Sequence, residues 1–288
     1  MKRIKGLVSV LLATSVIFAF AGCKNTDTQN KDQQATSETA QESMVKGDVK
    51  VSGSTSVEKI ANAEGEEFAA YNPDVKFSYE AIGSSGGIKN ANEGVTPIGS
   101  ASRNLKEEEK SWGMKEVVIA YDGIAIAVHP SNTVKDLTME DIAAIYKGEI
   151  TNWSQVGGSD KPIVVVSRED GSGTRGAFEE LLDFEKLLTK NALIAEGNGN
   201  VQSSVAGNEN AIGYVSLTSM DESIKALTVE GVEATIDNVL SEQYKISRPF
   251  LMVYHEKNMN EATNAYIEFI LSEEGQAIVK ENGGIPVK

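Results

Sequence analysis

The stretch that decides the fold is "PIVVVSREDGSGTRGAFEELLDFEKLL", residues 162–188. It begins with a short apolar run typical of a buried strand and ends with the apolar spacing of a helix. The turn between them places an arginine and two carboxylates among small residues. A turn that leaves a strand and enters a helix presents free backbone N–H groups and the positive end of the helix dipole. The pattern therefore predicts a strand, an anion-binding turn and a helix.

Two other segments repeat the order of strand, small polar turn and helix. "VKVSGSTSVEKIANAEGEEFAAY", residues 49–71, carries Val57, Ile60 and Phe68 near helical spacing, and "VKFSYEAIGSSGGIKNANEG", residues 75–94, has a longer turn. Each turn alone can be explained as an ordinary helix cap or loop. Three turns with glycine and hydroxyl side chains favour a shared anion site, because open α/β sheets bind ligands at the carboxyl ends of their strands.

The rest of the pattern predicts an α/β protein with mainly parallel sheets. "EVVIAYDGIAIAV", residues 116–128, is a strand pair or one continuous strand. "LTMEDIAAIYKG" predicts a helix that begins at Thr138 and ends near Gly148. The 288 residues exceed the usual size of one compact core, so two domains or one long domain are expected.

Composition narrows the classes of function. The net charge is −15, and loss of Lys2, Arg3 and Lys5 with a cleaved leader would make the protein more acidic, which disfavours nucleic acid and anionic membrane surfaces as partners. One cysteine and two separated histidines, His129 and His255, provide no disulfide, zinc cluster or thiol redox pair. We expect neither a cofactor nor a metal site.

The N-terminus resembles a bacterial lipoprotein leader. "MKRIK" is basic, "GLVSVLLATSVIFAF" is apolar, and "AGC" ends at Cys23, with Phe20 where leucine is more usual. The match implies a signal peptide over residues 1–22 and lipid on Cys23; a buried free cysteine behind an ordinary signal peptide is the alternative. Residues 23–47 are expected to form a disordered tether. A two-chain anchor gives stable attachment, so we expect the folded part on the extracytoplasmic face of the cell membrane.

Several motifs together resemble the phosphate-binding proteins of Pst-type ABC transporters, in their shorter lipoprotein form. They are "GSTSV", "AIGSSGGIK", "IGSASRNL", "DLTMEDIAAIYKGEITNW", "VVVSREDGSGTRGAFEE" and "AIGYVSL". The resemblance runs from about Val49 to the C-terminus. It implies a monomeric, non-enzymatic receptor that captures inorganic phosphate and delivers it to the permease subunits of an importer.

The resemblance also implies the type II periplasmic-binding-protein fold, which is α/β with two lobes. Each lobe would hold a mixed, mainly parallel sheet flanked by helices. The chain would cross between lobes near Val128–Pro130 and Arg248–Phe250. Lobe one would then comprise residues 48–128 and 249–288, and lobe two residues 129–248.

Carried over position by position, the family pattern implies a phosphate site built from three turns. Its residues are Thr55, Ser56, Ser84, Arg168, Ser172, Gly173 and Thr174. Arg168 would be the single charged donor, and Asp170 would hold its guanidinium in place. The alternative for this pair is a surface salt bridge beside a loop.

One departure concerns the acceptor for the phosphate proton. Many family members place an aspartate where this chain has Ser102. A carboxylate acceptor favours protonated phosphate over sulfate, so serine weakens that selectivity. Asp122 is a candidate substitute, or else an aspartate that bonds its own backbone at a turn or strand end. Arg103 is a second cationic contact, or forms a solvent-facing ion pair with "KEEE", residues 106–109.

Other classes of function remain open. Ser172 beside an arginine could indicate a phosphatase or phosphoryl-transfer enzyme, but no residue that would activate it is evident. The sequence has no G-x-x-x-x-G-K-[ST] run, and neither histidine lies near a G-x-S-x-G elbow. A receptor for another tetrahedral oxyanion such as sulfate, or a sensory or adhesive lipoprotein uncoupled from transport, is also compatible with the sequence.

Overall fold

This computed structural model describes residues 45–287. The predicted signal peptide, Cys23 and nearly all of the predicted tether lie outside them. The described residues all belong to one compact unit. Strand β1 begins at Gly47, and Val45 already packs against the core of the first lobe. The fold therefore begins slightly earlier than the predicted Asp48.

Within the described residues, the main sheet is mixed and has nine strands, in the order β2-β1-β3-β11-β4-β8-β6-β7 with β9 beside β4. Parallel pairing joins β1 to β2 and β3, and β6 to β7 and β8, whereas β4 and β11 are antiparallel to their neighbours. The strands before the three predicted turns therefore lie in the parallel parts. The bounds are β1 Gly47–Gly53, β2 Val75–Ala81, β3 Ile98–Ala101, β4 Lys115–Val128, β6 Val164–Arg168, β7 Leu193–Ala195, β8 Ala211–Ser216, β9 Lys225–Ala226 and β11 Ser247–Tyr254.

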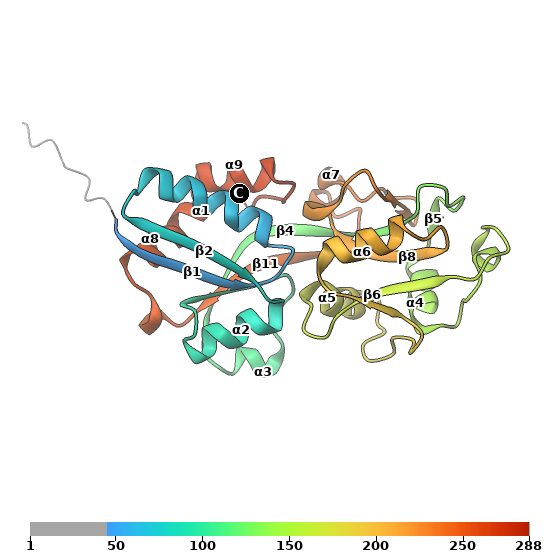
Figure 1. Cartoon of the computed structure of the whole chain (residues 1–288), viewed down its shortest axis with the longest axis horizontal. Coiled ribbons are helices and arrows are strands. Elements are labelled where there is room, and N and C mark those ends of the chain that lie inside the picture. Colours follow the sequence, from blue (N-terminus) through green and yellow to red (C-terminus); the bar gives the residue numbers. More distant parts are fainter. Residues whose placement is uncertain (1–44, 288) are drawn as a thin grey trace, which may run out of the picture. The chain divides into compact units, whose positions relative to one another are not determined.

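Helices flank the sheet, and a separate pair of short strands lies in the second lobe (Figure 1). The helices are α1 Glu58–Tyr71, α2 Ser84–Glu93, α3 Glu107–Lys110, α4 Met139–Lys147, α5 Gly173–Leu181, α6 Gly197–Ala206, α7 Ile236–Leu240, α8 Glu261–Ile270 and α9 Glu273–Glu281, and the short strands are β5 Asp136–Leu137 and β10 Thr228–Val229. Thr138 caps α4 and Gly148 ends it, as predicted. None of the described helices is long and apolar enough to cross a membrane.

Alternate residues of β11 show that both faces of the sheet are covered in the first lobe. Phe250 and Met252 pack with residues of α1, α8 and α9, whereas Leu251 and Val253 pack with residues of α2. Successive side chains of a strand point to opposite faces. The sheet of the first lobe is therefore the middle layer of three, as is typical of α/β folds.

The second lobe is built the same way around the other half of β4. Ile124, Ile126 and Val128 pack with residues of α4 and α5. Ala125 and Ala127 face the opposite side and pack with residues of α6. One continuous strand therefore contributes to the cores of both lobes, which decides between the two predicted forms of the 116–128 segment.

The first crossing between lobes lies earlier than predicted. Strand β4 pairs with β11 as far as Gly123 and with β8 from Ile124 onward. The predicted boundary at Val128–Pro130 is the end of the strand, not the change of lobe. The apolar run continues through the crossing, so the sequence does not mark it. On the return, Ile246 packs in the second lobe and Phe250 in the first, which brackets the predicted position.

Candidate functional site

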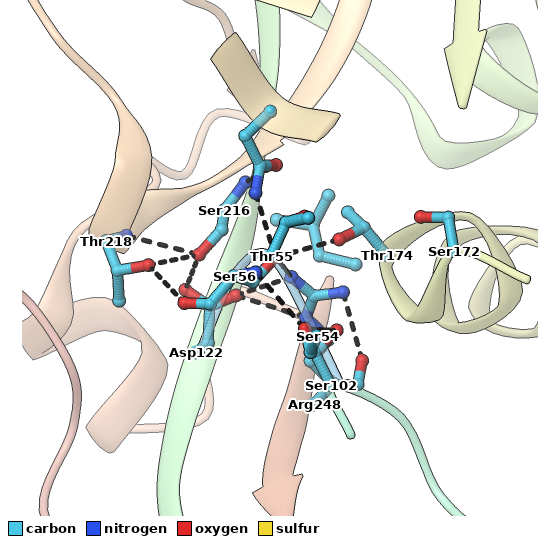
Figure 2. A network of polar contacts seen from close by, with 12 residues as sticks. Ser54, Thr55, Ser56, Ser102, Asp122, Ser172, Thr174, Ser216, Thr218 and Arg248 are labelled. Carbon is cyan, nitrogen blue, oxygen red and sulfur yellow. Dashed lines mark hydrogen bonds and ion pairs between the residues drawn. The ribbon is translucent and has the colours of Figure 1, made fainter. Parts of the chain in front are cut away.

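A cluster of buried hydroxyls lies in the first lobe, beyond the carboxyl ends of β1 and β3 (Figure 2). Ser54 Oγ donates to Ser102 Oγ at 2.8 Å, and the backbone N–H of Ser56 donates to Ser54 Oγ at 3.1 Å. The N–H of Ser102 donates to Ser84 Oγ at 3.0 Å. The parallel pairing of β1 with β3 aligns these turns, so residues distant in sequence share one cluster.

The second lobe contributes the turn between β6 and α5. Arg168 is the last residue of β6, and Ser172 caps α5 by accepting a hydrogen bond from the N–H of Arg175 at 3.2 Å. Gly173 and Thr174 form the first turn of this helix. The predicted order of strand, turn and helix is confirmed here, with helical N–H groups at the turn, but the helix ends at Leu181 and not near the predicted residue 188.

Direct hydrogen bonds join the two lobes at these turns. Ser56 Oγ and Thr174 Oγ1 share a hydrogen bond of 3.0 Å, and Arg168 Nη2 donates to Thr55 Oγ1 at 3.1 Å. Gly173 lies so close to the first lobe that an added Cβ would be 2.1 Å from Ser84 Oγ. The seven predicted site residues therefore occupy facing turns of the two lobes.

The predicted pairing of Asp170 with Arg168 is wrong. Arg168 donates from Nε and Nη2 to the two oxygens of Glu169, each at 2.8 Å. The Asp170 side chain is 97% exposed and accepts from Nη1 of Arg175 instead. The longer Glu169 side chain folds back along the guanidinium, whereas the turn directs Asp170 to solvent.

Arg168 and Glu169 form a bidentate ion pair that is largely shielded from solvent. Arg168 is 1% exposed. Burial disfavours the charged form of Glu169, but the hydrogen bonds and the charge of Arg168 outweigh it and hold the pKa of Glu169 below its ordinary value. A bidentate arginine loses little freedom when it binds an anion. The arrangement prepares Arg168 for an anion at the junction of the lobes.

Asn198 belongs to this network and was missed from the sequence. Its Oδ1 accepts from Arg168 Nη1 at 3.3 Å, and its Nδ2 donates to Ser56 Oγ at 3.0 Å. It lies in the first turn of α6, just after β7. "LIAEGNGN", residues 193–200, is therefore a fourth strand, glycine-containing turn and helix, and this order was the available signal.

Asp122 and Arg248 form a buried ion pair on the strands that cross between lobes. Nε and Nη2 of Arg248 donate to Asp122 Oδ2 at 3.1 and 2.8 Å, and Ser216 Oγ donates to Asp122 Oδ1 at 2.8 Å. Complete burial raises the pKa of Asp122, although Arg248 and Ser216 favour its charged form. The alternative of an aspartate that serves only its own turn is wrong, because Asp122 lies inside β4 and bonds to distant residues.

Arg103 is committed to an ion pair outside the hydroxyl cluster. Its Nη1 and Nη2 donate to the two oxygens of Glu109 at 2.7 and 2.8 Å, and Nη2 also donates to Ser85 Oγ at 3.1 Å. The partner belongs to the predicted "KEEE" segment. The pair is buried rather than solvent-facing, since the two side chains are 4% and 8% exposed.

The histidines take no part in the network. His129 bonds to Ser131, and His255 bonds to Asn92. Within residues 45–287, no group of three or more His, Cys, Asp or Glu side chains could hold a metal ion. Hydroxyl, amide and guanidinium donors therefore gather where the two lobes meet, shielded from solvent. Such a set of donors suits the non-covalent binding of an oxyanion.

Comparisons with known proteins agree with this geometry. Residues 33–274 match the family model described as a PBP superfamily domain. A phosphate-binding protein PstS from Bacillus subtilis is 30% identical over 296 residues, covering 100% of this chain and 95% of its own length. The chain is also similar to a phosphate ABC transporter substrate-binding protein from Clostridium perfringens, solved with bound phosphate: 57% identity, TM-score 0.83, 84% of this chain and 100% of that one.

A further solved structure is an ABC-type phosphate transport receptor from Vibrio cholerae, with 37% identity, a TM-score of 0.73, and coverage of 83% of this chain and all of that one.

The fold, the facing turns and the family match define a substrate-binding protein with a two-lobed periplasmic-binding-protein fold. Within that class, the chain belongs to the Pst-type phosphate-binding protein family.

Proposed function

We propose that this protein captures inorganic phosphate between its two lobes and hands it to the permease subunits of an ABC importer. The observation that carries the proposal is the meeting of Arg168 and the first turn of α5 with the hydroxyls of Thr55 and Ser56. No covalent step is required, and we expect no catalysis. The hydroxyls can exchange their bonds to one another for bonds to the oxygens of a bound anion.

Charge-assisted hydrogen bonds in the solvent-shielded site support the binding of phosphate, although the protein as a whole is acidic. Local donors act at short range, whereas surface charges are screened by salt beyond about 10 Å. A ligand that contacts both lobes favours the closed state over the open one. The proposed cycle is therefore opening to load, closure on phosphate, and presentation of the closed form to the transporter.

Equilibrium titration tests the choice of ligand. We expect purified protein to bind one phosphate per chain, with arsenate competing and sulfate binding more weakly. Preference for sulfate would replace phosphate with the alternative oxyanion. Phosphate binding without co-purification of permease subunits from membranes would instead favour a sensory lipoprotein.

Replacing Thr174 with valine should weaken phosphate binding by about 1–3 kcal/mol, because a desolvated ligand oxygen loses its donor. The change keeps the shape of a side chain that is 1% exposed. Calorimetric titration measures the loss. Thr133→Val, at an exposed position of the second lobe, is the matched control and should bind like wild type. Equal affinity of Thr174→Val and wild type would refute the assignment of this helix start.

We also propose that Cys23 carries the lipid anchor, which holds a monomeric receptor on the extracytoplasmic face of the membrane. The leader-like sequence before it supports this placement. Cys23→Ala should release the protein from the membrane fraction into the soluble extracytoplasmic fraction. Immunoblots of separated fractions provide the measurement, and retention of the alanine variant in membranes would contradict the anchor.

A further inference from the structure

Arg248 is a second buried guanidinium that no sequence pattern assigned to the ligand. It lies on β11 where the chain returns to the first lobe, and its side chain is 1% exposed. Besides Asp122, it contacts two of the three hydroxyl-bearing turns of the first lobe. Its Nη2 donates to Ser56 Oγ at 3.1 Å, and its Nη1 donates to the carbonyl of Ser102 at 3.0 Å.

The contact with Ser56 places Arg248 at the point where the lobes meet. The same Ser56 hydroxyl also bonds to Thr174 Oγ1 and to Nδ2 of Asn198, both from the second lobe. Asn198 in turn accepts from Arg168. Two guanidiniums therefore approach one hydroxyl, Arg248 directly and Arg168 through a single amide (Figure 2 shows Arg248 and Ser56).

Both guanidiniums retain donor capacity. A guanidinium has five N–H groups. Arg248 uses four of them on Asp122, Ser56 and Ser102, and Arg168 uses four on Glu169, Thr55 and Asn198. In each case one Nη1 hydrogen has no hydrogen-bond acceptor among residues 45–287. Each Nη1 already makes one hydrogen bond, and its second hydrogen is free to donate to a ligand oxygen.

Electrostatics supports the same conclusion. Burial lowers the pKa of Arg248, Asp122 opposes this effect, and the positive charge of Arg168 adds to the lowering. The two cations are thus close enough to repel in a medium of low dielectric constant. An oxyanion that contacts both would reduce this repulsion.

We propose that Arg248 is a second cationic contact for the anion and that Asp122 is its positioning residue. This inference deepens the proposed function and rests on it. Asp122 fixes the plane of the guanidinium through Nε and Nη2, and Nη1, which donates one hydrogen to the Ser102 carbonyl, keeps its second hydrogen for the ligand. The site then holds the ligand between two arginines, one from the second lobe and one from the crossing strand.

The test removes both charges of the pair while retaining two side chains that can hydrogen bond. Asp122→Asn/Arg248→Gln should lower phosphate affinity by about ten- to a hundredfold, as expected for loss of one charged hydrogen bond. The loss should be larger for the phosphate dianion than for the monoanion, so titrations are run above and below the second pKa of phosphate. If the Asp122–Arg248 pair only stabilised the two strands, the affinities for the monoanion and the dianion would fall equally or not at all. Either result would overturn the proposal.

A matched control separates this effect from the general cost of losing a buried ion pair. Glu109→Gln/Arg103→Gln neutralises the other buried pair of the first lobe and should retain wild-type affinity. An equal loss in the control would also overturn the proposal. Thermal unfolding checks that each variant is folded.

If the Asp122–Arg248 double variant does not fold, Arg248→Lys decides the question. A single ammonium cannot serve Asp122 and a ligand with the fixed fork of arginine, so phosphate affinity should fall several-fold with the charge kept. Unchanged affinity would overturn the proposal. Wild-type protein that binds no phosphate would contradict the proposed function itself, whereas wild-type affinity in the neutral pair would contradict only the role of Arg248.

Discussion

Arg168→Ala should weaken phosphate binding by about 2–5 kcal/mol, the usual cost of truncating one partner in a buried, charged hydrogen-bond pair. Three effects contribute. A cation is lost at the junction of the lobes, Thr55 loses its hydrogen-bond donor from the second lobe, and the Glu169 carboxylate loses its guanidinium partner. Sulfate binding should fall by a similar amount, because the lost charge does not distinguish the two anions. Calorimetric titration of both anions measures the change.

Arg175→Gln is the matched control for Arg168. Arg175 lies in the same motif, but its side chain pairs with Asp170 and Glu179 and donates to the backbone carbonyl of Arg168. Among the described residues it has no side-chain hydrogen bond to a hydroxyl of the first lobe. It should retain phosphate affinity close to wild type. If Arg168→Ala bound phosphate as tightly as this control, the anion would lie elsewhere and the proposed site would be wrong.

Gly173→Ala should also weaken phosphate binding strongly, by about 1–3 kcal/mol, the typical cost of overpacking a close contact. A methyl group here would lie 2.1 Å from Ser84 Oγ and 2.6 Å from Ser102 Oγ, both in the other lobe. The lobes must then stay farther apart, which lowers the population of the closed, binding-competent state. Titration measures affinity, and small-angle scattering with and without phosphate reports closure.

The stability of the lobes provides the control for this variant. Gly173 begins a helix without a positive φ, so alanine suits its backbone and the unfolding temperature should change little. Gly199→Ala, on α6, adds a methyl that meets no atom within 4 Å beyond its own stretch of the helix, and it should leave both affinity and closure unchanged. Normal closure of Gly173→Ala on phosphate would contradict the close approach of the two turns.

The sequence was most informative where structure is local. The buried face of α1 was predicted from the spacing of Val57, Ile60 and Phe68, all of which are buried. The three strand-turn-helix junctions were predicted for the same reason, because caps, glycines and apolar periodicity lie within a few residues of each other. These junctions bring most of the predicted site residues together across the lobes.

The remaining parts of the site depend on tertiary pairing, which a single sequence does not reveal. Ser54 meets Ser102 only because β1 and β3 are parallel neighbours. Arg248 reaches Asp122 because β11 runs antiparallel to β4 at the crossing. The choice of Glu169 over Asp170 depends on the direction in which the turn points each carboxylate, which the family pattern behind the assignment of Asp170 did not reveal.

The central claim, that phosphate is held between the lobes by these turns, is tested most directly by a crystal structure of the protein with arsenate. Arsenate is a tetrahedral analogue of phosphate, and arsenic can be located from its anomalous scattering. We predict one strong arsenic peak with arsenate oxygens at hydrogen-bond distance from Arg168, Thr174 and the hydroxyls of the first turn. A peak elsewhere on the molecule, with none between the lobes, would contradict the account.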